Sequence, residues 1–280
     1  MSIIKNASSF ARLDHVTEDF SWLEGEELAQ VFEALPKMIE EANDRPSQNQ
    51  WNAFWSEHSD VSSPLYFPPR FTIDGQGVYR CWQKYIKSPV ENLESIFHDY
   101  LLAKVQDQLM KGIEHIVEFG CGIGHNLKKI KSRNQDISIY GSDWSDASIK
   151  LLEKSQIPGF MFDMKKCKNI ESLPHDICDK ENVCFMTVGS LEQLGEEWVE
   201  FFDFMKRVKP KKSIHIEPIA ELYDPRNYSD VLAIRYHNKR RYLKNFFSEA
   251  YASKHIKWYQ RSYFGNVFNE GYTVMELQYD

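Results

Sequence analysis

Three alternate glycines, Gly120, Gly122 and Gly124, follow a short apolar run that ends in VEF. Glycine lacks a Cβ atom, so a turn built from it lets the backbone approach a ligand closely. A helix that begins directly after such a turn presents free N–H groups and the positive end of its dipole. The pattern therefore predicts a site for a nucleotide-like molecule, with Cys121 as a small side chain within the turn.

Two carboxylates stand at the ends of the next two predicted strands. Asp143 lies about 20 residues after the glycine turn, where doubly wound folds bind a ribose. An ionised carboxylate accepts the two hydrogen bonds that a ribose diol donates. Asp163 could accept a hydrogen bond from the exocyclic amine of adenine, while Trp144 and Met164 could pack on the ring. These strand ends together suit an adenosine with a polar tail.

At these residues the chain resembles the class I S-adenosylmethionine-dependent methyltransferases. The matching segments are VEFGCGIG, YGSDWS, FDM and VCFMTVGSLEQLG, and the resemblance extends over roughly residues 112–280. It implies an α/β fold with a Rossmann-like seven-stranded sheet, helices on both faces and S-adenosylmethionine as the cofactor. Two strand-like runs at 256–263 and 272–279, with no helix between them, fit the antiparallel hairpin that ends this sheet. A nicotinamide enzyme is disfavoured because His125 occupies the third glycine position of its fingerprint.

The resemblance also suggests roles for residues around the predicted pocket. Glu118 would contact the methionine amino group, and Ser190 and Glu192 would line the pocket for methyl transfer. Alternation places His215 and Glu217 on one face of the fifth strand, where either could act as a general base or anchor the substrate. For each charged residue the alternative is a structural role, as a cap or a strand end.

Candidates for substrate binding come from two other regions. Arg70 follows two prolines and could bind a carboxylate of the cofactor or the substrate. The connection after the fifth strand is rich in tyrosine and could shape substrate choice, although each of its residues is more often structural. The candidates in this connection are Tyr223, Tyr228, Tyr236 and His237.

Composition excludes several classes of protein. The chain has 280 residues, and its net charge of −7 argues against a general nucleic-acid binder. No apolar run reaches about 18 residues, so we expect no membrane-spanning helix, and residues 1–15 lack the apolar core of a signal peptide. Five cysteines without a C-x-x-C pair make a disulfide framework or a structural zinc site improbable. We therefore expect a cytoplasmic protein without a bound metal.

We expect a helical N-terminal extension over residues 1–110, which closes over the carboxyl ends of the strands, and a methyltransferase domain over 111–280. Residues 90–109 and 232–247 are predicted helices, and 73–77 a loop. The predicted activity is in-line transfer of a methyl group to a small-molecule acceptor, on nitrogen or oxygen. Glu192 and Glu217 favour an amine-bearing acceptor. The alternatives are a protein, peptide or RNA methyltransferase and a catalytically silent cofactor-binding relative.

Overall fold

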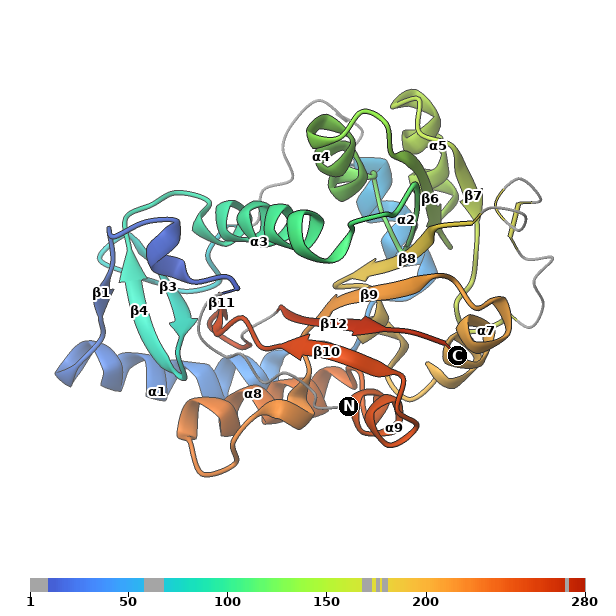
Figure 1. Cartoon of the computed structure of the whole chain (residues 1–280). Coiled ribbons are helices and arrows are strands. Elements are labelled where there is room, and N and C mark those ends of the chain that lie inside the picture. The colour runs from blue at the N-terminus through green and yellow to red at the C-terminus, as the bar shows by residue number, and fades with distance from the viewer. Residues whose placement is uncertain are drawn as a thin grey trace.

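The computed structural model describes residues 10–57, 68–167, 173–174, 177, 181–269 and 272–279, and all structural statements concern these residues. A seven-stranded sheet with the order β10-β12-β9-β8-β5-β6-β7 forms the centre of the chain (Figure 1). Neighbouring strands from β9 to β7 are parallel, while β12 is antiparallel to both β9 and β10. The strands are β5 (His115–Phe119), β6 (Ser138–Asp143), β7 (Gly159–Met161), β8 (Val183–Val188), β9 (Lys212–Glu217), β10 (Ile256–Gln260) and β12 (Thr273–Leu277). This topology confirms the predicted Rossmann-like sheet and its antiparallel terminal hairpin.

Helices cover both faces of the central sheet because the buried strands are apolar on both sides. Ile116 and Val117, consecutive in β5, belong to the cores on opposite faces. The first face is covered by α3 (Leu93–Leu109), α4 (His125–Arg133) and α5 (Asp146–Lys154), and the second by α7 (Val199–Val208) and α9 (Phe246–Ala252). A cavity lies at the carboxyl ends of the parallel strands, and residues of α3 and α4 belong to its lining.

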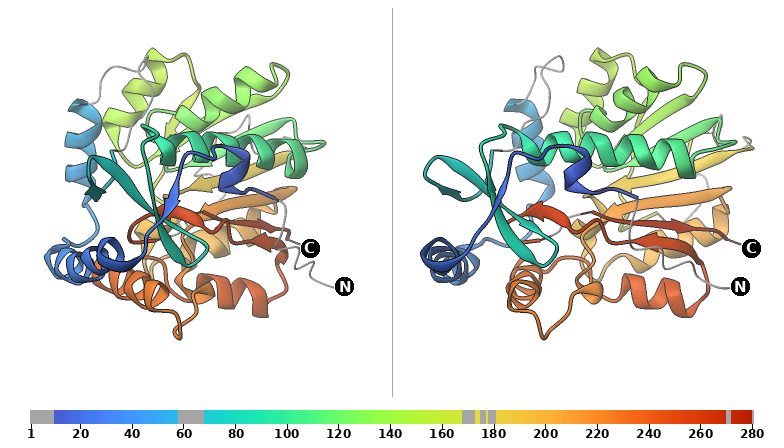
Figure 2. Two further views of the ribbon diagram at one scale, coloured as in Figure 1. Left: turned by 90° about the vertical axis from the view of Figure 1, so that its left-hand side faces the viewer. Right: turned by 60° about the vertical axis from the view of Figure 1, so that its left-hand side comes forward.

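A second, smaller sheet lies beside the central one (Figure 1). Its strands are β1 (Ser21–Trp22), β2 (Thr72–Ile73), β3 (Gln76–Cys81), β4 (Lys84–Ser88) and β11 (Phe264–Asn266). Helices α1 (Gly25–Glu41) and α8 (Tyr228–Arg240) pack side by side against this part of the chain (Figure 2). Helix α2 spans Gln48–Glu57. The short helical turns are η1 (Leu13–His15), η3 (Leu191–Leu194) and η4 (Ala220–Leu222). The N-terminal region thus contains strands as well as the expected helices, and β11 pairs with β3 across the expected domain boundary.

Local backbone geometry explains where the structure differs from the expected elements. Asp74 and Gly75 have φ angles of 51° and 76°, which is the geometry of a two-residue hairpin turn. The expected loop at 73–77 is therefore wrong, since β2 and β3 form a hairpin around this pair. The expected helix at 232–247 divides into α8 and α9, because Arg241 and Asn245 adopt left-handed conformations with φ angles of 51° and 64°.

A buried ion-pair cluster joins the small sheet to the rest of the chain. Asp230 in α8 is completely buried and pairs with Arg80 of β3. It also accepts hydrogen bonds from Arg261, at 2.7 Å, and from Gln83, at 2.8 Å. Because Arg261 follows β10 directly, one carboxylate holds three separate segments together.

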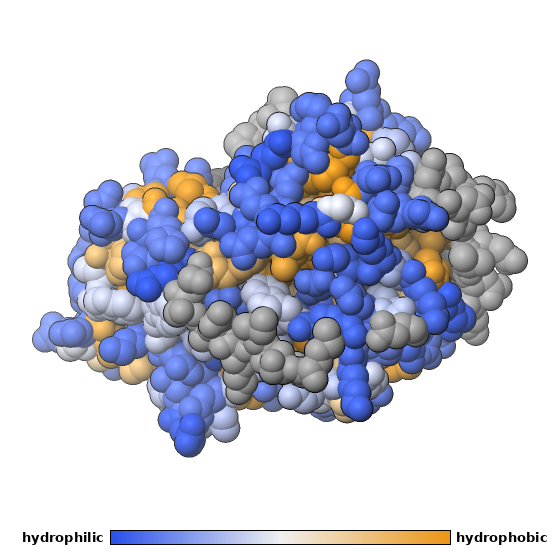
Figure 3. Space-filling model, viewed as in Figure 1, coloured by the Kyte–Doolittle hydropathy of each residue, from blue (hydrophilic) through white to orange (hydrophobic). Residues whose placement is uncertain are grey.

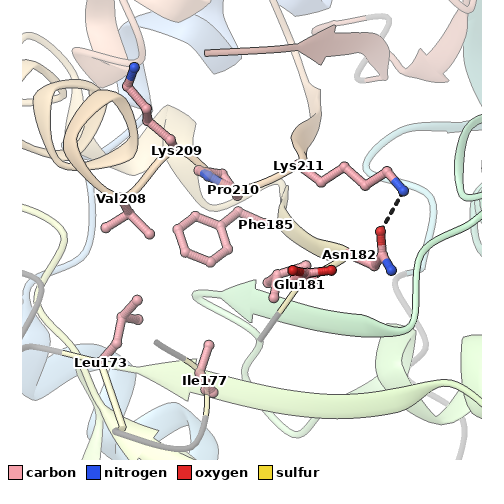
Figure 4. Close-up of a pocket in the computed structure, with 10 residues that line it drawn as sticks. Leu173, Ile177, Glu181, Asn182, Phe185, Val208, Lys209, Pro210 and Lys211 are labelled. Carbon is pink, nitrogen blue, oxygen red and sulfur yellow. Dashed lines mark hydrogen bonds between the residues drawn. The ribbon is translucent and has the colours of Figure 1, made fainter. Parts of the chain in front are cut away.

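Other surfaces carry fewer functional signals. The face shown in Figure 3 is mostly hydrophilic, with small hydrophobic patches between charged side chains. A cavity of about 440 Å³ lies at the amino ends of β8 and β9, where Lys211 donates to Asn182 at 2.6 Å beside Phe185 and Pro210 (Figure 4).

Within the described ranges, no helix is long and apolar enough to cross a membrane. Four cysteines are free thiols, and Cys178 lies outside the described residues.

Candidate active site

A cavity of about 750 Å³ lies at the carboxyl ends of the central strands. Its walls come from the glycine turn, the ends of β6, β7 and β8, helices α2, α3 and α8, and the region around β11. The sequence-predicted residues in its lining are Arg70, Glu118, Gly120, Cys121, Gly122, Asp143, Trp144, Asp163, Met164, Ser190, Glu192 and Tyr236. The chain thus gathers most of the proposed cofactor residues around one space.

The glycine turn has a backbone that only glycine adopts without strain. Gly120, Gly122 and Gly124 have φ angles of 69°, 54° and 71°. An added Cβ at Gly120 would lie 2.5 Å from the Cβ of Ser190, and one at Gly122 would lie 2.5 Å from the ring of Trp55. Gly120 and Gly122 line the cavity, whereas Gly124 is outside its lining and approaches core side chains.

Asp143, at the end of β6, is bound to the glycine turn. Its Oδ2 atom accepts a hydrogen bond from the Gly122 N–H at 3.0 Å, and its Oδ1 atom accepts one from the Ser145 N–H at 2.9 Å. Burial raises the pKa of Asp143 to about 6. Each carboxylate oxygen has a second lone-pair site, so Asp143 can still accept hydrogen bonds from a molecule in the cavity.

Glu118 presents an unsatisfied acceptor at the cavity wall. The side chain is almost fully buried, and its Oε1 atom accepts from Asn126 Nδ2 at 2.6 Å. The Oε2 atom is buried without a hydrogen-bond partner among the described residues. Burial, with repulsion from Asp143 and Glu217, raises the pKa of Glu118 to about 8. A cationic hydrogen-bond donor at Oε2 would satisfy this atom and favour its ionised form.

Residues from β6 and β7 form the next part of the wall. Trp144 follows β6 directly, and the Lys165 ammonium lies 5.8 Å from the centre of its ring. Asp163 Oδ1 accepts from the Lys165 N–H at 2.9 Å, and Met164 lies beside it in the lining. Aromatic, thioether and carboxylate groups therefore occur together where the adenine is expected.

Helix α2 covers the glycine turn from the N-terminal region. The Trp55 ring lies against Gly122, and Gln48 donates a hydrogen bond to the Trp144 main-chain oxygen. Asn52 Oδ1 accepts from Ser145 Oγ at 2.7 Å. These contacts place α2 over the end of the cavity that holds Gly122 and Asp143.

His215 lies outside the cavity lining. Its ring is completely buried in β9, with Nδ1 at 2.8 Å from Thr187 Oγ1 and Nε2 at 2.9 Å from Ser213 Oγ. Burial lowers the pKa of His215 to about 3, so the ring is neutral at pH 7. These contacts fit a structural role for His215, which was the alternative to a catalytic one.

Glu217 is also outside the lining, and it caps a turn that supplies two lining residues. Its carboxylate accepts from the N–H groups of Ser190, Leu191 and Glu192 at 3.2, 3.0 and 3.2 Å. Three backbone donors at one carboxylate fix the start of η3. Glu217 thereby positions Ser190 and Glu192 without reaching the cavity itself.

Of the four candidates in the tyrosine-rich connection, Tyr236 lies in the cavity lining, and Tyr223, Tyr228 and His237 do not. Tyr223 is buried, with the Arg261 guanidinium 4.6 Å from its ring centre. Tyr228 is 48% exposed and contacts Phe32 edge-on. His237 is buried, and its ring meets Tyr223 edge-on at 5.6 Å.

Helix α3 supplies cavity residues that the sequence interpretation did not include. Glu94 Oε1 accepts from Asn266 Nδ2 and from the Tyr272 hydroxyl, both at 3.3 Å. The ring of His98 lies one helical turn further, 5.3 Å from the ring of Tyr272. Burial lowers the pKa of His98 to about 4, so this cavity-lining ring is neutral at pH 7. In the sequence, the i, i+4 spacing of Glu94 and His98 within the predicted helix could have indicated that both side chains lie on one face.

A comparison with protein-family models finds no match, and neither does a comparison with curated protein sequences. Solved structures do match. Geranyl diphosphate C-methyltransferase from Streptomyces coelicolor A3(2), crystallised with Mg²⁺, geranyl diphosphate and S-adenosyl-L-homocysteine, has a TM-score of 0.51 and 11% identity, over 85% of this chain and 100% of that chain.

Two further likenesses cover less of the chain. An O-methyltransferase family protein from Burkholderia thailandensis has a TM-score of 0.44 and 12% identity, over 68% of this chain and 60% of that one. Human N-acetylserotonin methyltransferase has a TM-score of 0.41 and 12% identity, over 67% of this chain and 57% of that one. The likeness to the Streptomyces enzyme, together with the strand order, identifies the fold as that of the class I methyltransferases.

Proposed function

We propose that the chain is an S-adenosylmethionine-dependent methyltransferase that acts on a small-molecule acceptor, on nitrogen or oxygen. The observation that carries this proposal is the single cavity, which joins the glycine turn and its carboxylates to an end lined by aromatic and polar side chains. The Streptomyces C-methyltransferase, crystallised with geranyl diphosphate and S-adenosyl-L-homocysteine, supports a small-molecule acceptor, while the choice of nitrogen or oxygen is our proposal.

The charges of the cavity fit this cofactor. S-adenosylmethionine carries a sulfonium, an ammonium and a carboxylate, and the Glu118 Oε2 atom, which has no partner among the described residues, offers an acceptor for the ammonium. Asp143 would hold the ribose hydroxyls and Asp163 the adenine amine, with Trp144 and Met164 against the ring. Gly120 and Gly122 line the same cavity, where the methionine part would lie against their main chain.

When bound, the cofactor supplies a methyl group that its sulfonium already activates. The chain must then bind and orient the acceptor, exclude water and manage one proton. Helix α2 closes one end of the cavity, while Tyr236, Tyr242 and Tyr272 line the acceptor end. Glu192 and the neutral His98 lie in the same lining and are our candidates for hydrogen bonding to the acceptor, and His98 is the candidate for accepting its proton.

The four described cysteines have no disulfide partner, which supports a reducing compartment such as the cytoplasm for this activity.

Calorimetry with S-adenosylhomocysteine tests the cofactor site. Asp143→Ala should weaken binding at least about tenfold, because it removes charge-assisted acceptors for the ribose. Asp146→Asn is the matched control, since Asp146 is exposed in the first turn of α5, three residues away. Unchanged affinity in Asp143→Ala would refute the ribose assignment, and no binding by the unaltered protein would refute the proposed function.

A further inference from the structure

The cationic side chains that line the cavity differ in the partners that they have within the protein. Among the described residues, the lysines and arginines of the lining are Arg70, Lys165 and Arg240. Lys165 Nζ lies 2.6 Å from Glu197 Oε2. Arg240 Nη1 donates to the main-chain oxygens of residues 43–44 at 2.6 and 2.8 Å. The charge of Lys165 is therefore paired within the protein, while Arg240 directs one of its nitrogens to main-chain oxygens.

Arg70 is held in place while most of its donors stay available. Its Nη1 atom donates to the Tyr236 hydroxyl at 2.9 Å, and its guanidinium carbon lies 5.8 Å from the ring centre of Phe268. Tyr236 and Phe268 are both buried and stacked, with 4.2 Å between ring centroids. Stacking uses the face of a guanidinium and leaves its in-plane N–H groups free. Within the described ranges no carboxylate forms an ion pair with Arg70.

Glu94 and Glu192 in the lining attract Arg70 electrostatically, but among the described residues neither forms an ion pair with it. Glu94 Oε1 is already bonded by Asn266 and Tyr272. Burial and the neighbouring Glu217 raise the pKa of Glu192 to about 8, so this residue is mainly protonated at pH 7. Among the described residues, no carboxylate therefore contacts the remaining donors of Arg70, and an anion in the cavity can reach them.

We propose that Arg70 binds an anionic group of the methyl acceptor, either a carboxylate or a phosphate. This inference rests on the function proposed above and names the class of its acceptor. Both groups accept two parallel hydrogen bonds from a guanidinium. Arg70 contacts α8 and the segment after β11, away from the glycine turn, so we assign it to the acceptor and not to the cofactor. Aromatic side chains in the same lining suit an apolar body attached to the acidic group.

Ligand-observed NMR titrations with simple aromatic probes test this proposal. Benzoate and benzamide have nearly the same shape and differ in charge, and phenyl phosphate supplies the second kind of anion. The protein is titrated with each probe, alone and with S-adenosylhomocysteine bound. The variants are Arg70→Met, Arg70→Lys and, as a charge-matched control, Arg235→Met. Arg235 lies in the same helix as Tyr236, is partly exposed and pairs at 3.8 Å with the exposed Glu40.

We expect the unaltered protein and Arg235→Met to bind an anion at least about tenfold more tightly than benzamide. Arg70→Met should remove this preference, and Arg70→Lys should keep part of it because it keeps the charge. The tighter of the two anions identifies the acidic group of the acceptor.

Three results would overturn the proposal: no saturable anion binding, no preference for anions over benzamide, or a preference that survives in Arg70→Met. A loss of S-adenosylhomocysteine affinity in Arg70→Met, with the benzoate preference intact, would reassign Arg70 to the cofactor. Failure of the unaltered protein to bind S-adenosylhomocysteine would refute the proposed function instead, and the titrations without it would still measure the anion preference.

Discussion

The substitution Glu118→Gln tests how a buried carboxylate, with one oxygen that lacks a hydrogen-bond partner among the described residues, changes protein stability with pH. The pKa of Glu118 rises from 4.5 to about 8, mainly through burial. Between these values the folded protein keeps a proton that the unfolded chain has lost. The stabilisation from this proton is complete below pH 4.5 and disappears as the pH rises through about 8. The unfolding free energy should therefore fall with rising pH across this window.

The size of the effect follows from the pKa difference. At about 1.4 kcal/mol per pKa unit, Glu118 contributes at most about 5 kcal/mol to the change in unfolding free energy between pH 4.5 and 8. Glutamine keeps the shape and the acceptor for Asn126, but it does not ionise. The variant should therefore gain stability relative to the unaltered protein as the pH rises.

Urea unfolding at several pH values between 5 and 8, without ligand, measures this difference. Glu114→Gln serves as the control, because Glu114 is exposed just before the same strand. Equal pH slopes for Glu118→Gln and the unaltered protein would refute the raised pKa. The same variant should bind S-adenosylhomocysteine about tenfold more weakly, since it loses a charge-assisted hydrogen bond to the ammonium.

Two further substitutions test the cover and the framework of the site. Trp55→Ala should expose residues 48–57 to limited proteolysis, because it removes the ring that packs on Gly122. Trp22→Ala should not, because the Trp22 side chain is already 43% exposed. Equal digestion of both variants would argue against α2 as a cover. Asp230→Asn should lower the unfolding free energy in urea by about 3–5 kcal/mol, because it leaves Arg80 and Arg261 buried without their carboxylate. Asp224→Asn, at an exposed ion pair nearby, should leave stability nearly unchanged, and a small effect of Asp230→Asn would show that the cluster does not hold the small sheet.

Local patterns in the sequence predict the central sheet well. Strands β5 and β9 are short segments that Gly120 and Pro218 follow directly. The helix at 146–154 begins after Ser145, whose side chain accepts the Ser148 N–H. The three glycines permit the positive φ angles that the turn adopts. These features depend on neighbouring residues, so they can be recognised without a structure.

Features that depend on contacts between distant segments could not be predicted in this way. Strand β11 is three residues long and pairs with β3, almost 200 residues earlier in the chain. Strand alternation places His215 and Glu217 on one face, but it does not reveal that Thr187 and Ser213 enclose His215, or that η3 folds back onto Glu217. Glu94 and His98 become cavity residues only because Asn266 and Tyr272 return to helix α3.

A crystal structure of the chain soaked with S-adenosylhomocysteine tests the central claim most directly. Our account predicts the ribose hydroxyls at Asp143, the amino group at Glu118 Oε2 and the sulfur facing the end of the cavity lined by Tyr236 and Tyr272. An unliganded cavity at saturating ligand, or a ligand bound elsewhere on the chain, would contradict it.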